Sequence, residues 1–132
     1  MSLIATLRDE HRQLSARLNE LLHLGIGGHE GRALLHRTGQ LVLAHLERED
    51  RQLYPALRAH PATRTLARQY ADEMTQLTPA VVAFFDSYRE GSADPLGFKR
   101  SLGQLLAVLQ QRIQREEGTL YPAYETHCAD AR

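Results

Sequence analysis

Apolar residues recur along this chain at intervals of three and four positions, which is the period of an amphipathic helix. Four stretches carry the pattern, at about 2–24, 30–60, 61–90 and 95–126, and glycine- or proline-containing breaks separate them. Sustained alternation of polar and apolar residues, the mark of a β-strand, is absent. Short connections between four long helices predict an all-α fold, an up-down-up-down antiparallel four-helix bundle.

The bundle is predicted to consist of two related helix pairs. Residues 9–14 (DEHRQL) correspond to residues 72–77 (DEMTQL) at an offset of 63, and residues 45–56 correspond to residues 112–123 at an offset of 67. Two such pairs, folded against each other, would bring four related segments to one centre. Helical bundles hold metal pairs at such centres with ligands from facing helices.

Polar residues occupy several positions on the apolar faces of these helices. In the first helix a histidine lies on the same stripe as Leu7 and Leu14, and Met74 has the corresponding position in the third helix. Five ionisable side chains are expected in the core: His11, His45, Glu49, Arg112 and Glu116.

Ionisable groups in a core need compensation, because an isolated buried charge costs several kcal/mol. A metal ion can provide it by taking the imidazoles and carboxylates as ligands. Alternatively, the guanidinium of Arg112 can provide it by forking onto Glu49 and Glu116, and Glu73 can reach inward as a further partner. The two arrangements are compatible. Without the metal, the same residues would form a polar core satisfied by Arg112 and internal water.

Composition limits the function classes. The 132 residues suit a single domain over residues 1–132, and 16 basic against 16 acidic residues argue against a nucleic-acid footprint or a polybasic membrane surface. Neither a membrane span nor a signal peptide is recognisable, so we expect a cytoplasmic protein. The lone Cys128 rules out an internal disulfide and reads as a surface residue. A protein partner, and the choice between monomer and homodimer, stay open.

The motifs resemble those of the hemerythrin-like (HHE cation-binding) family. That family has a histidine on the first and third helices, and a His-x-x-x-Glu followed shortly by Leu-Tyr/Phe-Pro on the second and fourth. Here His45 and Glu49 precede Leu-Tyr-Pro at 53–55, and Glu116 precedes Leu-Tyr-Pro at 120–122. His11 fits the first-helix position. The resemblance covers essentially the whole chain.

The resemblance implies a non-haem di-iron centre that binds oxygen, or senses oxygen, nitric oxide, redox state or iron. Carried over by position, the candidate metal ligands are His11, His45, Glu49 and Glu116, whereas Met74 and Arg112 replace two histidines. A thioether is a soft, weak ligand for iron, and arginine has no lone pair to offer. We therefore expect at most one ion, iron or another divalent metal such as zinc or manganese, and the alternative of no metal stays open.

The favoured interpretation is a non-enzymatic sensing, regulatory or metal-binding module with a degenerate di-iron site. The resemblance ties reversible oxygen carriage to an iron pair, since each iron supplies one electron. Two alternatives remain: a metal-free protein-interaction module on the same fold, and a metal-dependent oxidase or peroxidase. No nucleophile with an activating base stands out. Tyr54 and Tyr121 are expected on a different side of the helix from Glu49 and Glu116, packing the bundle end.

Overall fold

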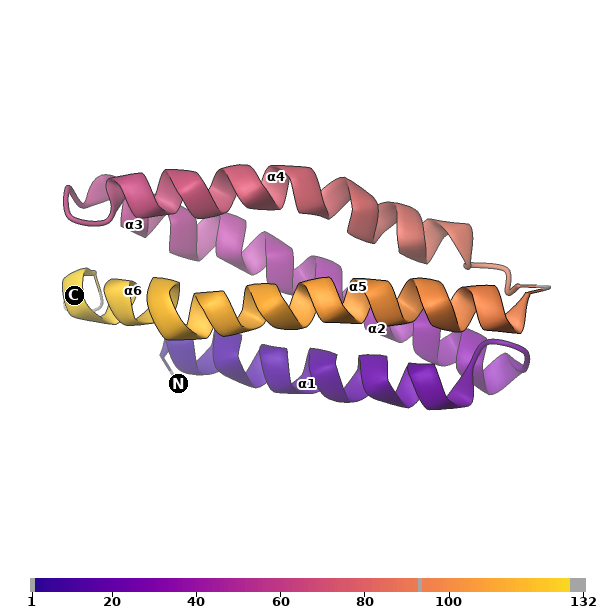
Figure 1. Ribbon diagram of the computed structural model, residues 1–132. Coiled ribbons are helices and arrows are strands. Elements are labelled where there is room, and N and C mark those ends of the chain that lie inside the picture. The colour runs from indigo at the N-terminus through magenta and orange to yellow at the C-terminus, as the bar shows by residue number, and fades with distance from the viewer. Residues whose placement is uncertain (1, 93, 129–132) are drawn as a thin grey trace.

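The computed structural model describes residues 2–92 and 94–128, which form four long helical segments. Figure 1 shows the segments side by side and antiparallel, with both ends of the described chain at one end of the bundle. No strand occurs within the described residues, so the all-α up-down-up-down prediction is confirmed. The first and third segments are single helices, and the other two are interrupted. In chain order the elements are α1 (Leu3–Leu24), α2 (His29–Arg48), η1 (Glu49–Leu53), α3 (Tyr54–Ala59), α4 (Arg64–Ser87), α5 (Pro95–Arg115), η2 (Glu116–Leu120) and α6 (Tyr121–His127).

Local capping explains where several helices begin and end. The Ser2 hydroxyl accepts a hydrogen bond from a backbone N–H of the first turn of α1, and Gly25 ends that helix with a positive φ of 71°. Asp94 caps α5 by accepting the Gly97 N–H at 2.9 Å, and Pro95 follows at the first helical position, as predicted. The helix predicted to begin at residue 61 is α4, and it begins at Arg64.

The second and fourth segments each contain a π-helical turn, η1 and η2, that the pattern of the sequence did not predict. In η1 the Tyr54 N–H bonds to the carbonyl of Glu49, five residues earlier, and in η2 the Tyr121 N–H bonds to the carbonyl of Glu116. A proline follows each tyrosine, and a proline ring clashes with the carbonyl four residues before it in a regular α-helix. The wider π-turn just ahead of the proline eases that clash, and such turns often occur at functional sites.

A polar layer divides the core into two apolar clusters. One cluster lies towards the α1–α2 and α4–α5 connections and contains Leu14, Val42 and Leu109. The other lies at the end of α3 and α6 and contains Leu7 and Leu120. Between the two clusters, three of the four segments carry ionisable side chains and α4 carries a methionine. These residues are His11, His45, Glu49, Met74, Arg112 and Glu116.

Two features of the described surface and core bear on the expectations above. No helix among the described residues is both long and apolar enough to cross a bilayer. Cys128, expected at the surface, is buried and lies 3.9 Å from the Thr63 hydroxyl, because α6 folds its end onto the α3–α4 connection.

Candidate metal centre

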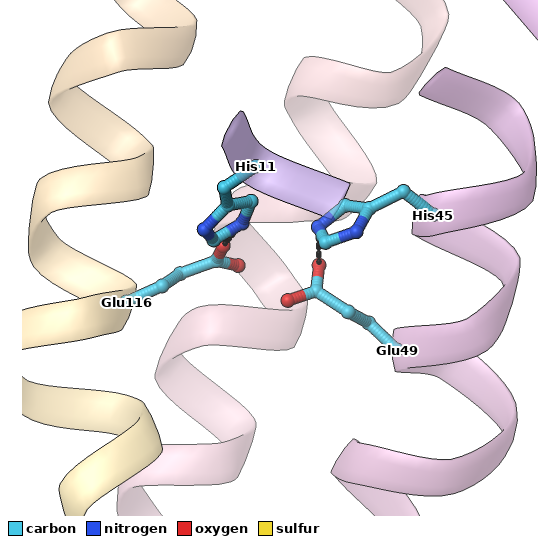
Figure 2. Close-up of side chains that lie close together, drawn as sticks. All are labelled: His11, His45, Glu49 and Glu116. Atoms are coloured by element: carbon cyan, nitrogen blue, oxygen red, sulfur yellow. Dashed lines mark ion pairs between the residues drawn. The ribbon is translucent and has the colours of Figure 1, made fainter. Parts of the chain in front are cut away.

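Four predicted ligands converge in the polar layer. His11 comes from α1, His45 from α2, and Glu49 and Glu116 each begin a π-turn. One donor atom from each residue lies within 4.8 Å of all the others, and none of the four side chains is more than 5% exposed. Figure 2 shows His11 facing Glu116 from another helical segment, and His45 facing Glu49 one turn further along its own segment. The closest approaches are 3.1 Å from His11 Nε2 to Glu116 Oε1 and 3.6 Å from His45 Nε2 to Glu49 Oε1.

Outer carboxylates orient both imidazoles. Nδ1 of His11 lies 2.6 Å from Glu117 Oε2, and Nδ1 of His45 lies 2.8 Å from Glu10 Oε1. Since a carboxylate only accepts, each Nδ1 carries the proton, and a neutral ring then presents its Nε2 lone pair to the centre. This arrangement of carboxylate, histidine and inward-facing nitrogen is typical of metal-binding histidines. Neither outer carboxylate was identified from the sequence, although Glu10 and Glu117 directly adjoin candidate ligands.

One of the two inward-facing nitrogens lacks a hydrogen-bond partner among the described residues. His45 Nε2 is buried and has no hydrogen-bond partner among the described residues. His11 Nε2 lies 3.1 Å from Glu116 Oε1, which is an acceptor, and 3.1 Å from the Tyr121 hydroxyl. Burial lowers the pKa of His45, with a further contribution from His11, so protonation of this ring is disfavoured. A cation is the group that satisfies two nitrogen lone pairs and two carboxylates at once.

The two central carboxylates titrate differently. Burial, followed by the charge and hydrogen bond of Glu116, raises the pKa of Glu49 well above its ordinary value. Burial alone would raise the pKa of Glu116 too, but the adjoining His11 and the charge of Arg112 bring it below its ordinary value. Glu116 is therefore the more acidic of the two carboxyl groups, and in the metal-free protein Glu49 keeps its proton to higher pH.

The Arg112 guanidinium is buried beside this cluster, with 7% of its side chain exposed. Its Nε bonds to Glu116 Oε2 at 3.2 Å, and Nη1 bonds to Glu73 Oε1 at 3.0 Å. Its Nη2 donates to the Tyr54 hydroxyl at 2.8 Å and to the Tyr70 carbonyl at 3.0 Å. One expectation is corrected: no ion pair joins Arg112 to Glu49 in the described structure. The guanidinium bonds instead to Glu73, whose side chain reaches inward from α4.

The network around Arg112 repeats the one around His45. Glu10 bonds to Nδ1 of His45 and accepts from Nε of Arg48, at 2.8 and 3.0 Å. At the offsets of 63 and 67 residues, Glu73 likewise bonds to Arg112 and to the partly exposed Arg115. A glutamate and an arginine therefore flank the central residue in both halves, and that residue is an imidazole in one half and a guanidinium in the other.

Tyr54 and Tyr121 were assigned to another side of the helix, and this assignment is wrong. The Tyr121 hydroxyl donates to Glu49 Oε2 at 2.9 Å and lies 3.1 Å from His11 Nε2. The reason is the π-turn: its wider winding places residues five apart on the same face, whereas a regular α-helix would separate them. Burial, with the charge of Glu49 next, raises the pKa of both phenols, so both are neutral in this setting.

Met74 lines a small cavity with the four candidate ligands and Arg112. The cavity has a volume of about 30 Å³, whereas a single water needs on the order of 10–15 Å³ by a comparable measure. Its size therefore suits one small occupant. Met74 thus lies at the centre, as its correspondence to His11 predicts, but it brings a thioether in place of a nitrogen.

Comparison with known proteins identifies the family. The model of the hemerythrin HHE cation-binding domain matches residues 2–124. The chain belongs to this family. Searches of curated proteins and of solved structures returned no match. Membership, together with the buried His/Glu cluster, supports cation binding as the general property of this hemerythrin domain.

The donor set suits one metal ion and not two. Two imidazole nitrogens and two carboxylates, with outer carboxylates behind the imidazoles, are ligands that iron, zinc and manganese all accept. A second ion would meet the Met74 thioether and the fixed positive charge of Arg112, which repels a dication and donates no lone pair.

Proposed function

We propose that this hemerythrin-like chain holds at most one divalent metal ion, iron or another, on His11, His45, Glu49 and Glu116. In this proposal Arg112 supplies the positive charge that a second metal would bring. The observation that carries it is the buried Nε2 of His45, which lacks a hydrogen-bond partner among the described residues and faces the centre. A cofactor of this kind would supply Lewis acidity and, if it is iron, a one-electron redox couple.

The protein residues have separate tasks at such a centre. The imidazoles and carboxylates bind, and Glu10 and Glu117 hold the Nδ1 protons and orient the rings. Arg112 stays positively charged at all accessible pH values and, after the larger effect of His11, helps to hold the pKa of Glu116 below its ordinary value. Binding of a cation would need the ionised form of Glu49, so the raised pKa of that carboxyl would make metal binding depend on pH.

We further propose a non-enzymatic role, as a cytoplasmic sensing, regulatory or metal-binding module. A single ion does not suit oxygen carriage, which the family resemblance ties to an iron pair. A single redox-active ion beside two buried carboxyl groups suits sensing, because a change in its oxidation state would change the net charge of the centre. In this proposal the chain is a monomer or homodimer. Its partner is a protein, and not a nucleic acid or a membrane.

A metal-free interaction module is the second candidate, because Arg112 already places a cation in the polar layer. Four of its bonds satisfy the guanidinium without any metal. This candidate leaves His45 Nε2 without a hydrogen-bond partner among the described residues, at a cost of about 1–3 kcal/mol for a buried polar group. We therefore rank it second.

Metal analysis separates the two candidates. The protein is loaded anaerobically with Fe²⁺ or with Zn²⁺, desalted, and measured for metal content and thermal unfolding. We expect one ion per chain after desalting, and a stabilisation of roughly 2.7 kcal/mol when unfolding is measured with free metal at 100 times the dissociation constant. His45→Ala should abolish both effects.

His36→Ala is the matched control, since His36 is an exposed histidine on the same helix and should leave metal binding unchanged. Two ions per chain would refute the degenerate centre. No bound ion and no stabilisation would establish the metal-free module instead.

A further inference from the structure

The Tyr121 hydroxyl lies against three of the four candidate metal ligands assigned above. Its oxygen is 2.9 Å from Glu49 Oε2, 3.1 Å from His11 Nε2 and 3.4 Å from Glu116 Oε1. Donors bound about 2.1 Å from one metal lie about 3.0 Å apart at right angles and about 3.4 Å apart at the tetrahedral angle. The phenol oxygen therefore has the spacing of a neighbouring ligand to three other donors.

The other half of the bundle shows how the corresponding tyrosine meets a cation. Tyr54 corresponds to Tyr121 at the offset of 67 residues. Its oxygen accepts a hydrogen bond from the guanidinium of Arg112 at 2.8 Å, so its lone pair is directed at the positive group in that half. At the same offset of 67 residues, Arg112 corresponds to His45, which would be a ligand of the metal. A tyrosine oxygen facing the cation is thus already realised on one side of the centre.

From these two observations we infer that Tyr121 is a fifth metal ligand, contributing its phenolate oxygen to the ion held by His11, His45, Glu49 and Glu116. The inference rests on the metal-binding function proposed above. On binding a ferric ion, the oxygen–metal bond forms, the O–H bond of Tyr121 breaks, and its proton leaves to the solvent. No electron is transferred in that step. The positive charge of the ion reverses the effect of the neighbouring carboxylates, which otherwise favour the neutral phenol.

The π-turn η2 makes this contact possible. It puts Tyr121 on the face of Glu116, five residues earlier, so one short segment brings two oxygen donors to the centre. The ring of Tyr121 is also stacked on the His11 imidazole, with centroids 5.4 Å apart and an interplanar angle of 15°. The phenol is therefore held at the site by packing as well as by hydrogen bonds.

A phenolate bound to ferric iron absorbs visible light, which makes the ligand detectable by spectroscopy. The purified chain is loaded anaerobically with Fe²⁺, oxidised with stoichiometric ferricyanide, desalted and examined by visible absorption and resonance Raman spectroscopy, with iron content measured in parallel. We expect a broad visible charge-transfer band with phenolate ring vibrations. Tyr121→Phe should lose the band, and Tyr54→Phe, the matched control, should retain it.

The outcomes distinguish this inference from the function on which it rests. Iron bound without the band, or a band that survives Tyr121→Phe, overturns the tyrosine ligand and leaves the proposed metal site standing. No iron bound by the unmodified chain overturns both. If Tyr121→Phe binds no iron, the ring vibrations of the unmodified chain and of Tyr54→Phe decide: their presence in both supports the ligand, and their absence refutes it.

Discussion

Glu73 Oε1 lies 3.0 Å from Nη1 of Arg112, in the place that Glu10 takes beside Nδ1 of His45 on the other side of the bundle. The carboxylate that orients an imidazole in one half thus neutralises a guanidinium in the other. Arg112 therefore has the same position relative to Glu73 that His45 has relative to Glu10.

Loss of the Arg112 charge is expected to destabilise the metal-free protein strongly. Arg112→Met preserves much of the side-chain volume but leaves buried Glu116 without its cation, which should cost about 3–5 kcal/mol in the free energy of unfolding. Urea denaturation after chelator treatment measures it. Arg115→Met is the control, because Arg115 pairs with Glu73 at the partly exposed edge, where the loss should stay below about 1 kcal/mol. Equal effects of the two changes would contradict a buried ion pair.

Restoring both missing histidines should restore the second metal. In Met74→His with Arg112→His, two nitrogen donors replace the thioether and the repelling guanidinium at a centre that both positions line. We expect a second equivalent of Fe²⁺ or Zn²⁺ by metal analysis. Met74→His alone keeps the guanidinium and should bind no second ion. A folded double variant with unchanged metal content would argue that these side chains do not decide the stoichiometry.

The outer carboxylates should tune metal affinity without contacting the ion. Glu10→Gln removes the negative charge behind His45, and Glu117→Gln does the same behind His11. Each change is expected to weaken metal binding by about 10–100-fold, measured by competition with a chromophoric chelator. Glu47→Gln changes an exposed glutamate on the helix that carries His45 and should have no comparable effect. If it weakened binding as much as Glu10→Gln, the effect would be one of general surface charge.

The metal-free protein should lose stability as pH rises, and Glu49 should be the cause. Its pKa is raised in the folded state by burial and by Glu116, so its contribution is complete below the unfolded value near 4.5 and disappears as pH passes the raised folded-state pKa. His45 acts in the opposite sense: its lowered pKa gives stability above the unfolded value of 6.5 that is lost as pH falls.

Glu49→Gln, which keeps a neutral side chain at all pH values, isolates the first contribution. Unfolding free energies measured across a pH series should decline more steeply towards alkaline pH in the unmodified protein than in this variant. Parallel profiles would show that Glu49 does not hold the proton.

The helical period alone determined the fold class and the inward direction of the six central side chains. His11, Met74, Arg112 and the others lie on apolar stripes because a regular helix repeats its face every three to four residues. That periodicity holds up to the first residue of each π-turn, and the predicted burial of these six side chains is confirmed.

Beyond Glu49 and Glu116 the helical period changes, and only the tertiary structure decided which side chains face the centre there. The π-turns move Tyr54 and Tyr121 onto the central face, a shift that regular helical periodicity cannot predict. The partners of the polar residues were equally beyond reach, because they come from other helices. Which carboxylate bonds to Arg112, and which bonds to each imidazole, depends on the packing of helices far apart in sequence, as in the pairs Glu73–Arg112 and His11–Glu117.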